Sequence, residues 1–234
     1  MFQLSAVEAR AGLENKDFSA EDLTRSCLSR IAEREETVGA WTYIDEELAL
    51  KRAQALDIFQ QSGEVLGTLH GLPVGIKDII DTNDMPTECG SAFYEGRRPL
   101  EDSTVAALLR RSGAIILGKT VTTEMALSAP GKTTNPHDPK RTPGGSSSGS
   151  AAAVGDNMVP LSVGSQTGGS VIRPASFCGI FGYKPTFGSI SRHGMSLLAR
   201  RLDHVGVYGR CIDDLALIGD ALMVNDSADW DMVK

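Results

Sequence analysis

Hydrophobic residues recur at helical spacing in the N-terminal quarter of the chain. Ser19 is typical of a residue that caps a helix start, and Leu23, Cys27 and Ile31 then follow at four-residue intervals on one face. A second helical pattern covers residues 45–61 and stops shortly before a glycine, a residue that often ends a helix. The pattern therefore predicts two helices ahead of the first strand.

The pattern changes from helical to extended near residue 70. Residues 72–80 are apolar, rich in β-branched side chains and bounded by Gly and Asp, which predicts a buried strand. The same reasoning predicts helices over 102–112, 150–154 and 212–223 and strands over 114–117, 159–163 and 204–208. Because helices and buried strands alternate, we predict an α/β fold with a mixed, largely parallel β-sheet core flanked by helices, in a single domain spanning residues 1–234.

Composition and charge narrow the class of protein. With 234 residues, of which 41% are hydrophobic, the chain can bury a substantial core. The formal net charge is -7 and like charges form no block, which argues against a nucleic-acid-binding arm or a basic membrane-surface patch. No segment approaches the roughly 20 apolar residues of a membrane helix, and the N-terminus lacks a secretory signal pattern. We therefore expect a cytoplasmic protein with neither a nucleic-acid nor a membrane partner.

The cysteines and histidines show no metal-site pattern. Cys27, Cys89, Cys178 and Cys211 are widely scattered without a C-x-x-C pair, and the histidines have no ligand spacing near them. This distribution favours reduced thiols in a cytoplasmic protein over a disulfide framework. We expect no metal and no organic cofactor.

One segment matches a nucleotide-binding pattern in its letters alone. Residues 113–120, GAIILGKT, satisfy G-x-x-x-x-G-K-[ST]. In a phosphate-binding loop a strand precedes the first glycine and the next residues curl around the phosphates. Here a predicted helix precedes Gly113 and the intervening residues form a predicted strand. We therefore reject nucleotide binding at this segment.

Three segments together carry residues that suit acyl-transfer chemistry. Lys77 lies inside an apolar strand pattern, Ser146 lies in the run GGSSSGS, and Ser170 follows the glycines of QTGGS. Taken singly, each has a structural explanation: an edge lysine, a flexible connector or an ordinary loop. Taken together, they offer a serine nucleophile and a lysine whose pKa desolvation can lower from about 10.4 toward neutrality. The glycines before Ser170 leave backbone amides accessible to a developing oxyanion.

In motif order and spacing, these segments closely resemble the amidase-signature family. The resemblance implies that Lys77 is the base, that Ser146 follows a cis peptide bond and relays the proton, and that Ser170 attacks the amide. It also implies an oxyanion hole formed by backbone amides. The residues that would donate them are Thr167, Gly168, Gly169 and Ser170.

Within the family, residues 75–82, 85–88 and 168–174 are most similar to the malonamidase branch. In that branch the arginine that matches Arg173 holds the free carboxylate of the substrate, and a guanidinium suits a carboxylate because it can donate two parallel hydrogen bonds. A purely structural role, in which Arg173 braces its loop, stays open. We expect an amidohydrolase that converts a small linear carboxylate-bearing amide, such as malonamate, to the acid and ammonia through an acyl-enzyme.

Two other functions fit the same segments. The chain could be the A-type subunit of a tRNA-dependent amidotransferase, which releases ammonia from glutamine and works with protein partners. It could also be a non-catalytic half-protein, because family members are usually much longer and the C-terminal part of the usual domain is expected to be absent. The resemblance further implies a homodimer.

Overall fold

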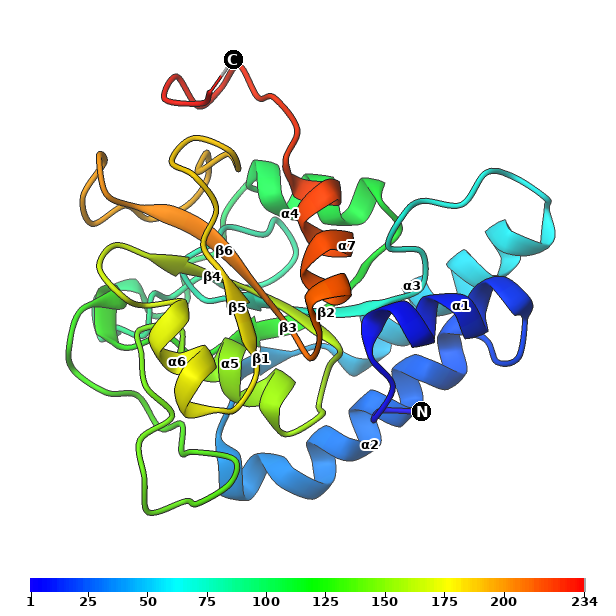
Figure 1. The fold of residues 1–234 in the computed structure, drawn as a ribbon, viewed down its shortest axis with the longest axis horizontal. Helices are drawn as coiled ribbons and strands as arrows, with labels where there is room; N and C mark the ends of the chain where they lie inside the picture. Colours follow the sequence, from blue (N-terminus) through cyan, green and yellow to red (C-terminus); the bar gives the residue numbers. More distant parts are fainter. Residues whose placement is uncertain (234) are drawn as a thin grey trace.

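The computed structural model describes residues 1–233 and is built around one six-stranded sheet (Figure 1). The strands are β1 (Trp41–Ile44), β2 (Pro73–Lys77), β3 (Ile115–Thr120), β4 (Leu161–Gln166), β5 (Phe181–Tyr183) and β6 (His204–Gly209). Their order in the sheet is β1-β3-β2-β4-β6-β5. Strand β2 pairs in parallel with β3 and β4, whereas β1, β6 and β5 join through antiparallel pairs. The predicted mixed, largely parallel sheet is confirmed.

Helices cover this sheet, and five of the seven α-helices within residues 1–233 begin close to the residues that the sequence indicated, whereas those over 6–15 and 172–177 were not predicted. They are α1 (Ala6–Asn15), α2 (Ala20–Val38), α3 (Glu46–Gln61), α4 (Thr104–Arg111), α5 (Ser148–Gly155), α6 (Ile172–Phe177) and α7 (Ile212–Leu222), with short 3-10 turns η1 (Ala92–Tyr94) and η2 (Glu124–Ala126). Ser19 caps α2 as predicted: its hydroxyl accepts from the Asp22 amide at 3.0 Å, and the Asp22 carboxylate accepts from the Ser19 amide. None of these helices is long and apolar enough to cross a membrane.

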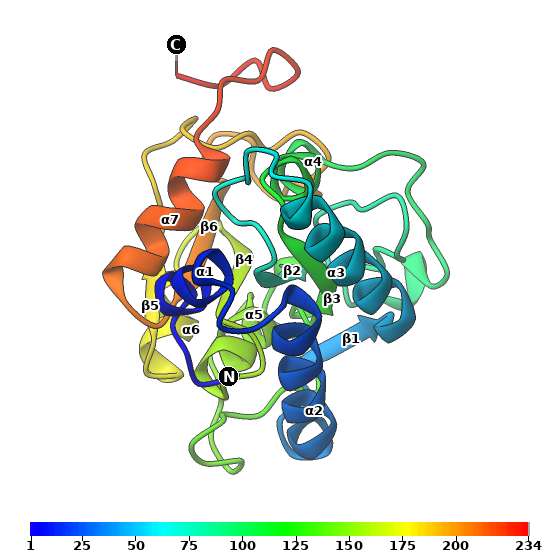
Figure 2. The same cartoon turned by 90° about the vertical axis from the view of Figure 1, so that its right-hand side faces the viewer.

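The first and last helices of the described chain pack against each other. Helix α1 lies beside α7 (Figures 1 and 2), and the Val7 amide donates to Asp214 Oδ1 at 3.1 Å. Asp214 is fully buried, and its other oxygen accepts from the Arg210 amide at 2.9 Å. One carboxylate therefore joins the N-terminal helix to the turn that begins α7.

The three central strands are buried along their whole length. Every residue of β2, β3 and β4 is buried, including the polar ends of these strands. Lys119 on β3 is fully buried, and its Nζ donates to Thr87 Oγ1 at 2.8 Å and to the Ile80 carbonyl. The segment that resembled a phosphate-binding loop is therefore an internal strand, as its sequence pattern predicted.

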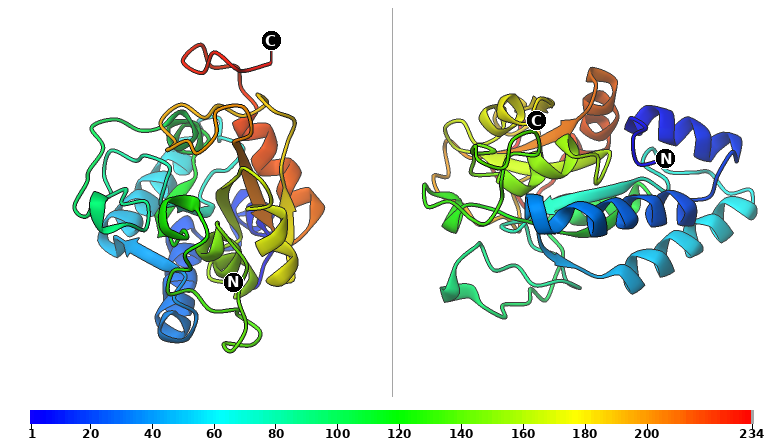
Figure 3. Two further views of the ribbon diagram at one scale, coloured as in Figure 1. Left: turned by 90° about the vertical axis from the view of Figure 1, so that its left-hand side faces the viewer. Right: turned by 90° about the horizontal axis from the view of Figure 1, so that it is seen from below.

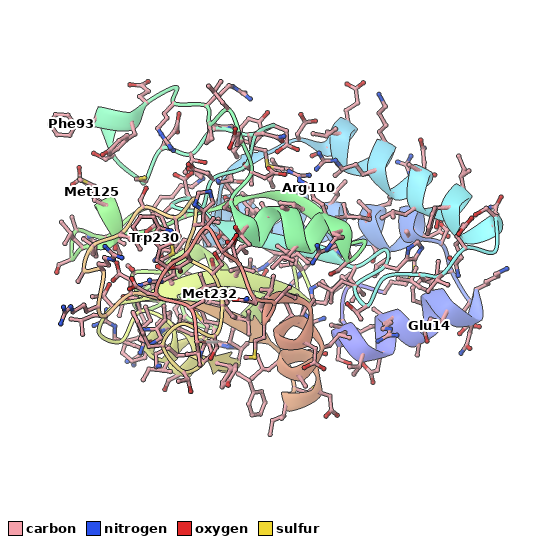
Figure 4. The ribbon with its side chains drawn as sticks, turned by 90° about the horizontal axis from the view of Figure 1, so that it is seen from above. Glu14, Phe93, Arg110, Met125, Trp230 and Met232 are labelled. Carbon is pink, nitrogen blue, oxygen red and sulfur yellow. The ribbon has the colours of Figure 1, made fainter. Side chains whose placement is uncertain are left out.

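The connection between β2 and α4 extends away from the sheet but is fixed at its base. Figure 3 shows this segment projecting from the body of the fold, and Figure 4 shows the side chain of Phe93 pointing outward. Phe93 is 91% exposed. At the base of the connection, the Glu88 amide donates to Asp78 Oδ1 at 3.1 Å and the Cys89 amide donates to the Asp78 carbonyl at 2.9 Å. Asp78 thus holds the returning chain directly beside Lys77.

Candidate active site

Lys77 is the last residue of β2, and its side chain lies wholly inside the protein. Its Nζ donates to Ser146 Oγ at 2.8 Å and to Ser165 Oγ at 2.9 Å. Because β2 and β4 run parallel, their carboxyl ends meet at the same edge of the sheet, and this pairing brings Ser165 to Lys77. The loop before α5 adds Ser146 from a third segment.

The surroundings of Lys77 disfavour its charged form. Burial lowers the pKa of Lys77 from its ordinary value of 10.5 to about 7, and the Asp203 carboxylate opposes this shift only in part. A large fraction of the amine is therefore neutral near pH 7 and carries a lone pair that can accept a proton. Ser146 and Ser165 suit either form, because a hydroxyl can donate to the amine or accept from the ammonium.

Ser146 lies in a loop held by neighbouring backbone and by one arginine. The Gly145–Ser146 peptide bond is cis, as the family resemblance implied. Ser146 is only 1% exposed, and its carbonyl accepts from the Thr123 amide at 3.0 Å. Arg173 donates to the Gly145 carbonyl through Nε at 3.0 Å and Nη2 at 2.6 Å. The structure thus brings Arg173 to the residue that precedes Ser146.

Ser170 lies on the short turn between β4 and α6 and is partly exposed. The Gln166 side chain holds this turn: its Oε1 accepts from the Val171 amide at 2.9 Å, and its Nε2 donates to the Gly168 carbonyl at 3.1 Å. Within residues 1–233 the Ser170 hydroxyl makes no hydrogen bond with Ser146 or with any other group. The structure therefore shows the contact between Lys77 and Ser146, whereas proton transfer from Ser170 stays a prediction.

The turn also presents a run of backbone N–H groups. Among the described residues, the amides of Gly168, Gly169 and Ser170 donate to no protein acceptor. Gly168 is exposed, and Gly169 and Ser170 are partly exposed. The side chain of the fourth predicted donor, Thr167, is fixed by a hydrogen bond from its Oγ1 to Asp203 Oδ1 at 2.5 Å. Adjacent free donors are what an oxyanion site requires, so the predicted set stays consistent with that role.

An open cavity of about 380 Å³ lies beside the Ser146 loop. Its walls are formed by Thr123, Leu127, Ser128, Pro130, Thr142, Gly144, Gly145, Arg173 and Phe177. Arg173 is exposed, and within residues 1–233 its Nη1 has no hydrogen-bond partner. The guanidinium therefore donates hydrogen bonds to the Gly145 carbonyl through Nε and Nη2, and its other N–H groups stay available at the cavity.

Sequence reasoning missed Ser165, Gln166 as a positioning group, and Tyr208. The first two lie within the glycine-rich segment that contains Ser170, but nothing in the sequence distinguishes their roles from those of neighbouring residues. Tyr208 Oη donates to the Ser170 carbonyl at 3.2 Å from a strand that follows much later in the chain. Only the pairing of β4 with β6 brings that hydroxyl to the turn.

Comparison with known proteins identifies one family. Residues 22–234 match the family described as Amidase. The A-type subunit of glutamyl-tRNA(Gln) amidotransferase from Natranaerobius thermophilus is 42% identical over 98% of this chain and 48% of that protein. Thus the chain spans about half the length of the curated relatives that it matches.

Solved structures agree with this result. A chain from the vestigial protein complex that reveals the origins of an s-triazine catabolic enzyme superposes with a TM-score of 0.95, at 35% identity, over 99% of this chain and 52% of that one. The peptide amidase of Stenotrophomonas maltophilia superposes with a TM-score of 0.92, at 31% identity, over 97% of this chain and 49% of that one. Relatives with different names therefore share this half of the fold.

The lowered pKa of Lys77 predicts a pH dependence of stability. Between pH 7 and 10.5 the unfolded chain holds a proton on this lysine that the folded chain has lost, so the free energy of unfolding rises with pH across that window. We expect the free energy of unfolding, measured by urea denaturation, to rise between pH 7 and pH 10 in the wild type. This rise is expected to exceed the rise in Lys77→Met by a few kcal/mol, since one pKa unit corresponds to about 1.4 kcal/mol.

The matched control is Lys51→Met, which removes an exposed lysine on α3. This variant is expected to keep the wild-type dependence on pH. Equal pH dependence in the wild type and Lys77→Met would show that the Lys77 amine is not desolvated in the folded chain.

Proposed function

The chain belongs to the amidase family, and on that basis we propose that it hydrolyses the C–N bond of an amide and releases ammonia through an acyl-enzyme on Ser170. The observation that carries this proposal is the fully buried Lys77 amine, which donates to Ser146 Oγ at 2.8 Å. A neutral amine that is hydrogen-bonded to a serine hydroxyl can act as a general base and receive a proton through that hydroxyl.

The proposed acylation uses groups that lie at the end of the sheet. The Lys77 amine takes the proton of Ser146 while Ser146 takes that of Ser170, and Ser170 Oγ forms a bond to the amide carbon. The oxyanion accepts hydrogen bonds from the free amides of Gly168, Gly169 and Ser170, with Thr167 as the fourth predicted donor. The proton then passes back along the same path to the amide nitrogen, the C–N bond breaks, and ammonia leaves.

Deacylation repeats the path with water as the nucleophile. Water gives a proton through Ser146 to Lys77 as its oxygen attacks the acyl carbon. The bond between that carbon and Ser170 Oγ then breaks, and the proton returns to Ser170, which restores the free enzyme and releases the acid. The cycle consumes one water and forms one acid and one ammonia, with no oxidation or reduction.

Glutamine is the substrate that the comparisons favour. The relative from Natranaerobius thermophilus is named as an A-type amidotransferase subunit, and it is 42% identical over almost the whole chain. We therefore rank an ammonia-releasing role of that type ahead of malonamate hydrolysis. On this proposal the chain works with protein partners that receive the ammonia, whereas the homodimer stays a prediction.

Malonamate is a second candidate because of the position of Arg173. This arginine lies three residues after Ser170, as in the malonamidase branch that the sequence resembles. Glutamine and malonamate both carry a free carboxylate, so one guanidinium can recognise either. Two of the five N–H groups of Arg173 point to the Gly145 carbonyl, and the rest are available for that carboxylate.

Covalent labelling tests the nucleophile and its base without knowledge of the substrate. We expect a fluorophosphonate to form an adduct at Ser170, located by peptide mass spectrometry. Ser170→Ala abolishes this adduct, and Lys77→Ala lowers its rate of formation by about a hundredfold or more because the general base is lost. Ser176→Ala, which removes an exposed serine on α6, is the matched control and labels as the wild type does. A folded wild-type chain that takes no label at Ser170 would overturn the proposal.

Arg173→Leu tests recognition of the carboxylate. We expect kcat/KM for glutamine and for malonamate to fall by about ten- to a hundredfold, because a charged hydrogen-bond donor is removed. For propionamide, which has no carboxylate, the loss is expected to be severalfold at most. Ammonia release measures all three reactions, and a higher kcat/KM for glutamine than for malonamate supports the amidotransferase-type role.

The control is Arg141→Leu, which removes an exposed arginine that pairs with Asp138. It is expected to leave all three rates unchanged. Equal losses on acidic and neutral amides in Arg173→Leu would show that Arg173 only braces the Gly145 carbonyl, and full activity on both acid amides would exclude both roles.

A further inference from the structure

Tyr208 is a fully buried side chain that reaches the nucleophile turn from the neighbouring strand. It lies on β6, where its backbone pairs with Ser162 of β4 on one side and with Gly182 of β5 on the other. Its Oη donates to the Ser170 carbonyl at 3.2 Å. A long side chain therefore bridges from the sheet to the peptide group that directly follows the proposed nucleophile.

A glycine on the flanking strand β4 makes room for this ring. A Cβ on Gly164 of β4 would lie 2.8 Å from Cε2 of the Tyr208 ring, closer than side chains approach one another. A Cβ on Gly182 of β5 would lie 3.4 Å from its Cδ1. The ring therefore occupies a slot beside Gly164 that a side chain there would fill, whereas at Gly182 a Cβ would make only an ordinary van der Waals contact with it.

The peptide group between Ser170 and Val171 is held on both of its polar atoms. The carbonyl accepts from Tyr208 Oη, and the Val171 amide donates to Gln166 Oε1 at 2.9 Å. These two side chains belong to different strands, so the peptide plane is fixed to the sheet from two directions. Burial also raises the pKa of the Tyr208 hydroxyl above its usual range, so it stays a protonated donor throughout the range in which an amidase is assayed.

We propose that Tyr208 is a positioning residue for Ser170: together with Gln166 it fixes the Ser170–Val171 peptide, and thereby the direction of Ser170 Oγ and of the free amides before it. This inference rests on the proposed function, because it concerns the same nucleophile. The physical reason is that a serine in a short turn keeps a reactive geometry only if its backbone cannot rotate. Tyr208 itself touches neither substrate nor the reacting atoms.

Tyr208→Phe removes the hydroxyl alone and leaves the ring in its slot. We expect the second-order rate constant for fluorophosphonate labelling of Ser170 to fall about three- to tenfold, as the loss of one buried hydrogen bond predicts. The kcat for ammonia release from glutamine falls by the same factor, with KM unchanged, because the change affects orientation and not binding. Tyr183→Phe is the matched control: this tyrosine is 40% exposed on β5, and its variant keeps wild-type rates.

Labelling separates positioning from folding, because the final amount of adduct reports how much protein is folded and the rate constant reports the reactivity of each folded molecule. A lower amount of adduct with a wild-type rate constant would show that Tyr208 only stabilises the fold and would overturn the inference. A wild-type rate and amount in Tyr208→Phe would overturn it as well. Failure of the wild type to label would instead overturn the proposed function, so the two failures are distinguishable.

Discussion

The burial of one amine at the carboxyl end of the central strand is the constraint on which the site depends. Water is excluded from Lys77, and this desolvation lowers its pKa to about 7. The amine needs polar partners inside the protein, and it finds them in Ser146 and Ser165, at 2.8 and 2.9 Å. The parallel pairing of β2 with β4 and the loop before α5 therefore bring these two hydroxyls to the Lys77 nitrogen.

A second buried lysine shows why partners matter as much as burial. Burial lowers the pKa of Lys119 on the adjacent strand to about 8, yet its Nζ donates to the Ile80 carbonyl and to Thr87 Oγ1. A backbone carbonyl can only accept a hydrogen bond, so it holds that nitrogen as a donor. Both partners of Lys77 are hydroxyls, which can donate as well as accept. Lys77 thus has two hydroxyl partners that can exchange a proton with it, whereas Lys119 has one, Thr87.

Local patterns predicted much of the fold, because strand burial and helix capping depend on residues that are close together in the sequence. Ser19 caps α2 as expected, and the apolar segment around Lys77 is a buried strand. The edge strands β1 and β5 were not predicted, since a half-exposed strand of three or four residues has too few positions to show a period. Tyr208 could not be found either, because its contact with Ser170 depends on how distant strands pair. Short motifs alone did not suffice to assign the malonamidase branch, and the comparisons favour amidotransferase subunits.

A neutral Lys77 near physiological pH is central to the proposed chemistry, and the titration of that amine tests it most directly. The protein would be prepared with ¹³C-labelled lysine, and the Cε signal of Lys77 would be assigned by its absence in Lys77→Arg and followed from pH 5 to pH 11. We predict a midpoint near pH 7, in agreement with the pKa of about 7 that burial gives this residue. A midpoint near 10.4, the value of a solvated lysine, would show that the amine is charged at neutral pH and would contradict its role as the base.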